Sequence, residues 1–273
     1  MHITIMSIQK PTIVIFDMDG TAVRHINPRL LHILEFLDSL CYKTSKIFSW
    51  IFKRGGKGRI VPSWHDPEWL NNNKKKPRLL VHRAIHRFRR KPVEQIVQPC
   101  PGLYDVLTYL KKNDIPLALV SNGLGKGYGH DILTKFDLNE YFGTTVFRED
   151  ISNSKPHPEP ILLALKRMGI EPKEDDVVWY LGDRHKDVIA ALAASKIIKG
   201  TITPIAVAFN AAMAVLEKNL GPDHIIMSYH DMYDQLIPMF EDVDESGELI
   251  EKKTDDFLNT PEQDAPPKKK ASI

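Results

Sequence analysis

The sequence lacks the features of membrane, secreted and disulfide-rich proteins. Its 273 residues contain no run of eighteen apolar residues, the length that a membrane-spanning helix needs. The N-terminal stretch has no signal-like hydrophobic segment followed by a cleavage site. The two cysteines, Cys41 and Cys100, are too few for a disulfide framework and too far apart for a CxxC metal pair. We therefore expect a cytoplasmic protein with no transmembrane segment, no zinc and no disulfides.

Charge is distributed unevenly, although the net charge is only +2. Residues 24–98 hold seventeen Lys and Arg against five Asp and Glu, a net charge of +12. Aromatic residues alternate with cations there, which is typical of segments that contact an anionic surface, nucleic acid or an anionic substrate. The same pattern is also typical of a small domain whose aromatic residues form its own core, and we favour that interpretation. Residues 241–273 are acidic with few large apolar residues, which predicts a disordered tail.

The hydrophobic pattern predicts an α/β fold. Short β-branched and aromatic runs predict buried parallel strands at 12–16, 116–120, 177–181 and 204–209, with an edge strand at 224–228. Helical patterns occur between them, at 102–113, 130–137, 158–169, 186–196, 211–220 and 231–240. This alternation predicts a three-layer, Rossmann-like parallel sheet with helices on both faces.

The first strand and its following helix are separated by a long segment. A plain loop of that length is uncommon, so residues 25–98 are expected to form a small basic helical cap inserted after the first strand. The core is then residues 11–24 and 99–240. Ligands of such sheets bind at the carboxyl ends of the strands, which is where the polar side chains of this chain gather.

Two carboxylates, Asp17 and Asp19, follow the first strand in the run DMDGT. A calcium loop beginning at Asp17 would require glycine and glutamate where Ala22 and Pro28 stand, so that interpretation fails. In a phosphoryl transfer, Asp17 can attack phosphorus and become an aspartyl phosphate. Asp19, two residues later, can protonate the leaving oxygen and then deprotonate the attacking water.

An anion that attacks a phosphate needs positive charge nearby, which Mg²⁺ and a lysine would supply. Asp183 can provide an oxygen ligand to Mg²⁺ beside Asp17, and Asp187 can be an outer ligand or orient one. Lys155 lies in a proline-rich stretch that enters a helix, where its ammonium would contact both nucleophile and phosphate. The remaining candidates for contact with the substrate phosphate are Gly20, Thr21, Ser121, Asn122 and Gly123.

The four runs DMDGT, VSNG, SKPHPEP and GDRHKD resemble, in this order, the four motifs of the haloacid dehalogenase-like hydrolase superfamily. The likeness covers residues 11–24 and 99–238 and is greatest to phosphatases of the phosphoglycolate phosphatase and phosphoglucomutase type, which have a helical cap after the first motif. It implies that Asp17 is the nucleophile and Asp19 the acid/base. It also implies that Ser121 and Lys155 bind phosphate and that Mg²⁺ is held by Asp17, the Asp19 carbonyl and Asp183, with Asp187 as the acidic partner.

The resemblance also indicates which chemistry to expect. Dehalogenases of the superfamily lack the second acid, so Asp19 argues against dehalogenation. Arg184 stands where a small residue is usual, and we expect its side chain to point to solvent. We predict a Mg²⁺-dependent phosphatase that hydrolyses a small phosphorylated metabolite through an aspartyl phosphate. The alternatives are a phosphomutase on the same core, and a protein that binds nucleic acid or an anionic surface through the basic cap.

Overall fold

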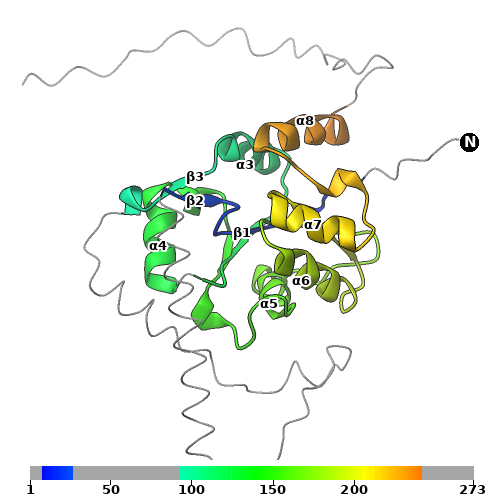
Figure 1. Ribbon diagram of the computed structural model, residues 1–273, viewed down its shortest axis with the longest axis horizontal. Helices are drawn as coiled ribbons and strands as arrows, with labels where there is room; N and C mark the ends of the chain where they lie inside the picture. The colour runs from blue at the N-terminus through cyan, green and yellow to red at the C-terminus, as the bar shows by residue number, and fades with distance from the viewer. Residues whose placement is uncertain (1–7, 27–92, 124, 242–273) are drawn as a thin grey trace, which may run out of the picture.

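The computed structural model describes residues 8–26, 93–123 and 125–241 (Figure 1). The predicted cap and acidic tail therefore lie almost wholly outside the described residues, and their predictions are not tested. No helix in the described ranges is long and apolar enough to cross a membrane.

Five parallel strands form the central sheet in the order β5-β4-β1-β6-β7. They are β1 (Ile13–Asp17), β4 (Leu117–Val120), β5 (Thr144–Val146), β6 (Val177–Gly182) and β7 (Thr201–Ala206). Every residue of β1, β4 and β6 is buried, as continuous apolar runs in a parallel sheet require. The chain builds the sheet outward from β1 in one direction and then returns to build the other side, so the strand order reverses beside β1.

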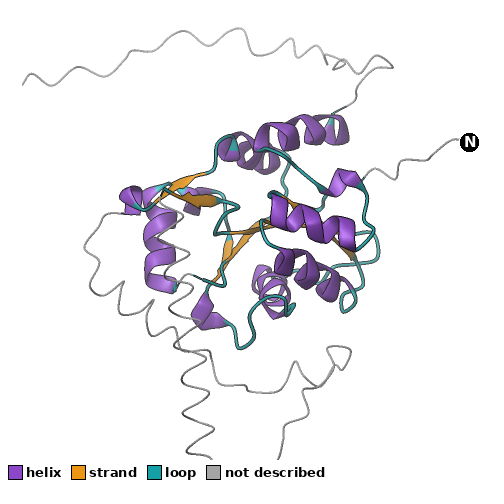
Figure 2. Cartoon of the chain, viewed as in Figure 1, coloured by secondary structure: helices purple, strands orange, loops and turns teal. Residues whose placement is uncertain are grey.

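Helices cover both faces of the sheet (Figure 2). On one face, Val14 and Phe16 of β1 pack in a cluster with residues of three helices. These helices are α3 (Leu103–Lys112), α4 (Lys126–Lys135) and α8 (Tyr229–Phe240). On the other face, Ile13 and Ile15 pack with α5 (Glu159–Met168) and α6 (His185–Ser195), while α7 (Phe209–Glu217) packs on α6 and β7. The predicted three-layer α/β architecture of the core is confirmed.

Two strand predictions were wrong. The segment 224–228 contributes a single bridge, Ala206 to Ile225, because β7 ends at Ala206 and leaves nothing further to pair with. The edge strand on the opposite side is β5, which has three residues and was missed because a run that short carries no period. The last strand also begins three residues earlier than predicted, and its Pro204 is tolerated because β7 lies at the sheet edge.

Helix α4 begins four residues earlier than predicted. The sequence predicted a helix at 130–137, but α4 begins at Lys126 and includes Gly127 and Gly129. A β-carbon at Gly129 would lie 2.1 Å from a ring carbon of Phe147, so glycine there allows the helix to pack closely.

A two-stranded antiparallel ribbon connects the core to the inserted segment. Its strands are β2 (Val23–His25) and β3 (Val97–Pro99), and Val23 is paired with Pro99. Four short 3₁₀ turns complete the described elements: η2 (Val93–Gln95), η3 (Leu138–Glu140), η4 (Arg148–Asp150) and η5 (Pro222–His224). The ribbon brings the point where the chain leaves the core next to the point where it returns.

Candidate active site

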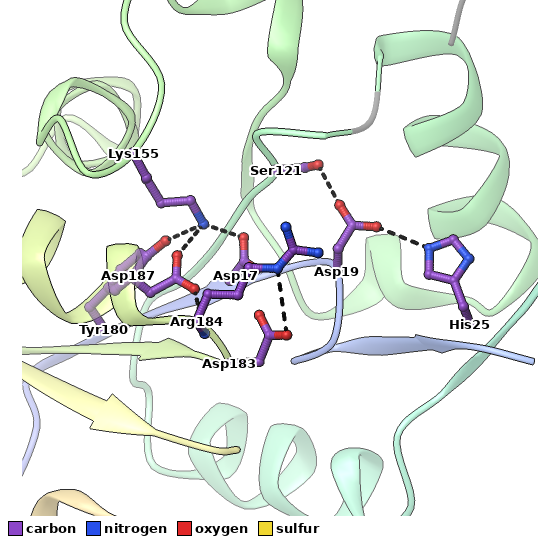
Figure 3. A network of polar contacts seen from close by, with 9 residues as sticks. All are labelled: Asp17, Asp19, His25, Ser121, Lys155, Tyr180, Asp183, Arg184 and Asp187. Atoms are coloured by element: carbon purple, nitrogen blue, oxygen red, sulfur yellow. Dashed lines mark hydrogen bonds and ion pairs between the residues drawn. The ribbon is translucent and has the colours of Figure 1, made fainter. Parts of the chain in front are cut away.

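The polar residues at the ends of three strands converge as the sequence predicted (Figure 3). Asp17 is the last residue of β1, Ser121 follows β4 directly, and Asp183 follows β6 directly. These three strands are neighbours, since β1 pairs with β4 on one side and with β6 on the other. The site therefore lies where the strand order reverses, the usual position for a ligand in such a sheet.

Lys155 lies at the centre of the site with its ammonium group surrounded by oxygen atoms. Its Nζ contacts Asp17 Oδ1, lies 2.6 Å from Asp187 Oδ1 and donates a hydrogen bond to the Tyr180 hydroxyl at 2.9 Å. The side chains of Lys155, Asp17 and Asp187 are all buried. Burial favours the neutral amine, but the charges of Asp17 and Asp187 outweigh it and raise the pKa of Lys155 well above its ordinary value. The ammonium form is thus fixed beside the predicted nucleophile.

The segment before Lys155 is held by hydrogen bonds to one carboxylate. Glu159, the first residue of α5, accepts hydrogen bonds from the backbone N–H groups of Ser152 at 2.6 Å and Asn153 at 2.8 Å. The guanidinium of Arg148, itself buried, donates to the Ser154 hydroxyl. These bonds fix the backbone that presents Lys155 to the site.

Asp17, Asp183 and Asp187 form a cluster of carboxylates. One oxygen from each can be chosen so that all three lie within 4.8 Å of one another. Burial raises the pKa of Asp17 well above its ordinary value, and repulsion from the other carboxylates adds to this effect, against the attraction of Lys155. Burial, followed by repulsion from Asp187, raises the pKa of Asp183 to about 6. One ammonium does not balance three carboxylates, so the cluster carries excess negative charge.

The cluster fits a divalent cation bound by oxygen ligands. Asp183 Oδ1 is buried and has no hydrogen-bond partner, which is costly unless another group occupies that position. Gly20 makes room for the Asp183 carboxylate: its φ is +84°, and a β-carbon there would lie 2.2 Å from Asp183 Oδ2. Asp187 is already engaged through both oxygens, one by Lys155 and the other by the backbone N–H of Arg184 at 3.0 Å. Asp17 and Asp183 are therefore the better candidates for metal ligands.

The Asp19 carboxylate points away from this cluster. Its Oδ2 accepts a hydrogen bond from the Ser121 hydroxyl at 3.1 Å, and its Oδ1 lies 3.6 Å from His25 Nε2. Burial favours the protonated acid, but the interactions with His25 and Ser121 outweigh it and lower the pKa of Asp19. The two acids of the first motif thus occupy different environments, which separates their protonation behaviour and suits different roles.

The predicted phosphate-binding residues line the same region. Thr21 and Asn122 have side-chain polar atoms that are buried without a hydrogen-bond partner in the described structure. A β-carbon at Gly123 would lie 3.2 Å from Asp19 Oδ2, so the loop after β4 passes close to the acid. The position of these groups is compatible with contact to a substrate, but their role stays a prediction.

Three residues of the site were missed or misread from the sequence. Tyr180 was counted only as part of a strand, although its hydroxyl contacts Lys155, and nothing in a β-strand pattern distinguishes that hydroxyl. His25 was placed in the cap, but β2 directs it to Asp19. The expectation that Arg184 points to solvent was wrong: its side chain is only 32% exposed, and its Nε lies 3.8 Å from Asp183 Oδ2.

The haloacid dehalogenase-like hydrolase family model matches residues 14–197, about two thirds of the chain. The chain belongs to this family. The resemblance drawn from its four motifs is therefore confirmed, and so is the predicted enzyme class, a phosphatase of this superfamily.

Individual relatives agree with the family assignment. The chain is 24% identical over 222 residues to a pyrophosphatase PpaX of Oceanobacillus iheyensis, covering 80% of this chain and 94% of the relative. It is 31% identical over 115 residues to a phosphoglycolate phosphatase of Escherichia coli K12, but this match spans only 42% of this chain and 44% of that protein.

Solved structures show the same fold. A hydrolase of the superfamily from Ehrlichia chaffeensis matches with a TM-score of 0.51 and 21% identity, over 85% of this chain and 99% of that one. A predicted phosphoglycolate phosphatase from Haemophilus somnus matches with a TM-score of 0.53 and 20% identity, over 83% and 98%. At this identity the likeness concerns the fold alone.

Proposed function

We propose that this hydrolase is a Mg²⁺-dependent phosphatase that hydrolyses a phosphate monoester through a phosphorylated Asp17. The observation that carries the proposal is the buried contact of Lys155 Nζ with Asp17, beside two further carboxylates. One carboxylate would be enough to balance the charge of a lysine with a purely structural role, so the three acids point to another purpose. A nucleophilic carboxylate that attacks a phosphate dianion needs both an ammonium group and a divalent cation beside it.

In the first step a carboxylate oxygen of Asp17 attacks phosphorus, and the bond from phosphorus to the ester oxygen breaks. Asp19 donates its proton to that oxygen, which leaves as an alcohol. Asp19 is mainly ionised in the free protein because its pKa is lowered. The phosphate dianion brings negative charge next to it, which raises that pKa and favours the protonated acid.

In the second step water attacks the phosphorus of the aspartyl phosphate. Asp19, now a carboxylate, removes a proton from this water, and the bond between phosphorus and the Asp17 oxygen breaks. Inorganic phosphate leaves and the Asp17 carboxylate is restored. Throughout both steps Lys155 stays protonated and balances charge on Asp17 and the phosphoryl oxygens.

Asp17 and Asp183 would hold the cation, together with the Asp19 carbonyl that the family resemblance implies. When bound, Mg²⁺ would offset the excess negative charge of the cluster and polarise a phosphoryl oxygen. The pair of Asp187 contacts, to Lys155 and to the Arg184 backbone, supports a role in holding Lys155 in place.

The substrate class follows from the relatives and stays part of the proposal. Their names give pyrophosphate and phosphoglycolate as substrates, and we propose a small phosphorylated metabolite for this chain as well. The cytoplasmic location also stays a prediction, as does contact of the basic cap with an anionic surface or nucleic acid.

The test is release of inorganic phosphate from a panel of phosphorylated metabolites by the full chain with Mg²⁺. Asp17→Asn should abolish turnover, and Asp19→Asn should lower kcat by roughly 10²- to 10⁴-fold, the usual contribution of a general acid/base. Asp131→Asn, an exposed aspartate on α4, is the matched control and should be fully active.

Two further observations separate the mechanism from its alternatives. Acid quenching during turnover of ³²P-labelled ester should leave label on the wild-type protein and none on Asp17→Asn. Multiple turnover with no added bisphosphate identifies a phosphatase, whereas a requirement for bisphosphate would identify a phosphomutase. An active Asp17→Asn protein would refute the proposal.

A further inference from the structure

Arg184 is a described side chain of this site whose position the proposed mechanism does not use. It precedes α6 and directly follows Asp183. Figure 3 shows its guanidinium extending past Asp183 toward the Asp19 carboxylate. Its charge acts on both acids, since it is among the influences that lower the pKa of Asp19 and that oppose the rise in the pKa of Asp183.

The side chain of Arg184 does not cap helix α6. What the start of α6 uses is the backbone N–H of Arg184, which donates to Asp187 Oδ2. Any residue other than proline provides that group. The side chain is 32% exposed, so part of it is accessible to solvent.

The position next to Asp19 indicates which part of a substrate would reach Arg184. In the proposed mechanism Asp19 serves the leaving oxygen, so a group beside Asp19 lies on the leaving-group side. The transferred phosphoryl group meets Lys155, which contacts the nucleophile Asp17, instead. Arg184 is therefore placed for the organic part of the substrate and not for the phosphorus that reacts.

The charge of the site indicates which chemical group the organic part of the substrate carries. Four carboxylates (Asp17, Asp19, Asp183 and Asp187) surround the site and would repel an anionic leaving group. A guanidinium on the leaving-group side offsets this repulsion, and its planar pair of N–H donors matches the two oxygens of a carboxylate or phosphoryl group. A neutral leaving group would gain little from it.

We propose that Arg184 is a specificity-determining residue that binds a second anionic group on the leaving-group side, a few bonds from the ester oxygen. This inference rests on the proposed function. It identifies the substrate class as phosphate monoesters that carry a second anionic group. A carboxylate and a phosphoryl group each present two oxygens to the guanidinium, so a carboxylate probe represents both kinds of second anion.

The experiment compares two esters of nearly equal size, 2-phosphoglycolate and 2-hydroxyethyl phosphate. The first has a carboxylate where the second has a hydroxymethyl group. The measured quantity is the ratio of their kcat/KM values with Mg²⁺. Arg184→Ala should lower that ratio on the order of 10- to 100-fold, as expected for a lost charge-assisted hydrogen bond. Arg184→Lys, which keeps the charge without the fork, should give an intermediate ratio.

Lys196→Ala is the matched control, because it removes one exposed positive charge at the other end of α6. It should leave the ratio at the wild-type value. An unchanged ratio in Arg184→Ala overturns the inference, whether both activities fall together or neither falls.

A binding measurement keeps this result separate from the proposed function. The matched phosphonates 3-phosphonopropionate and 3-hydroxypropylphosphonate have a P–C bond and are not hydrolysed, so calorimetry gives their affinities without turnover. Arg184→Ala should reduce the preference for the carboxylate compound by the same factor, and an unchanged preference overturns the inference. A wild-type protein that shows this preference but hydrolyses no ester would refute the proposed phosphatase and leave the Arg184 site standing.

Discussion

Asp183→Asn should stabilise the metal-free protein although it destroys the proposed metal site. The pKa of Asp183 is raised from 3.8 to about 6 by burial and by Asp187. The native state therefore binds a proton more readily than the unfolded chain between these two pH values. The carboxylate destabilises the native state above pH 6, and this penalty disappears as the pH falls toward 4. A shift of about two units corresponds to about 3 kcal/mol at pH 8, a net value that already includes the favourable Arg184 contact at 3.8 Å.

Urea denaturation of both proteins in EDTA, at pH 8 and at pH 5, measures the effect. The wild type should gain stability between pH 8 and pH 5, and Asp183→Asn should be more stable than wild type at pH 8, with the difference shrinking at pH 5. With Mg²⁺ at pH 8 the order should reverse, because only the wild type gains stability from binding the cation. Asp131→Asn serves as the control for removal of an exposed charge. A variant less stable than wild type in EDTA at pH 8 would refute the reasoning.

Three further predictions concern the packing around the site and the binding of Mg²⁺. Gly20→Ala should lower the free energy of unfolding by at least about 1 kcal/mol because Gly20 has a positive φ, and it should weaken stabilisation by Mg²⁺ because the new β-carbon displaces Asp183. Gly143→Ala, where the β-carbon meets open space, is the control and should have neither effect. Urea titrations with and without Mg²⁺ measure both effects. Tyr229→Phe removes the buried hydrogen bond to the Thr21 carbonyl at 3.0 Å and should lower the free energy of unfolding by about 1 to 2 kcal/mol, measured by urea denaturation; no change would contradict this. Mg²⁺ should raise the Tm of the wild type in a dose-dependent way, and a flat titration by scanning calorimetry would count against a metal site.

The sequence predicted the parts of the fold that depend on long periodic runs. β1, β4 and β6 lie where continuous apolar runs indicated them, and five of the six helices of the described core begin within two residues of the predicted positions, while α4 begins four residues earlier. The edge strand β5 was not predictable because three residues carry no period, and β7 begins three residues before the predicted strand. The ribbon of β2 and β3 depends on pairing between residues more than seventy positions apart, which no local pattern encodes.

Some residues of the candidate site could be predicted from the sequence and others could not. Its acids were found because they occur in ordered motifs at strand ends, which the topology of a parallel sheet brings together, and Lys155 was found in the motif that enters a helix. The contacts of His25, Tyr180 and Arg184 were not found, because they depend on the direction of single side chains. Direction is decided by packing among distant elements, and a motif contains no information about it.

The ribbon of β2 and β3 has a consequence for how proteins built in this way change their substrates. Its strands are antiparallel neighbours, so a turn of two to five residues would suffice to join His25 to Val97 in place of the native insertion. The core site and the predicted cap would then be joined at this ribbon alone. If the predicted cap selects the substrate, an exchange of the inserted segment at this junction would change selectivity while leaving the candidate catalytic residues in place.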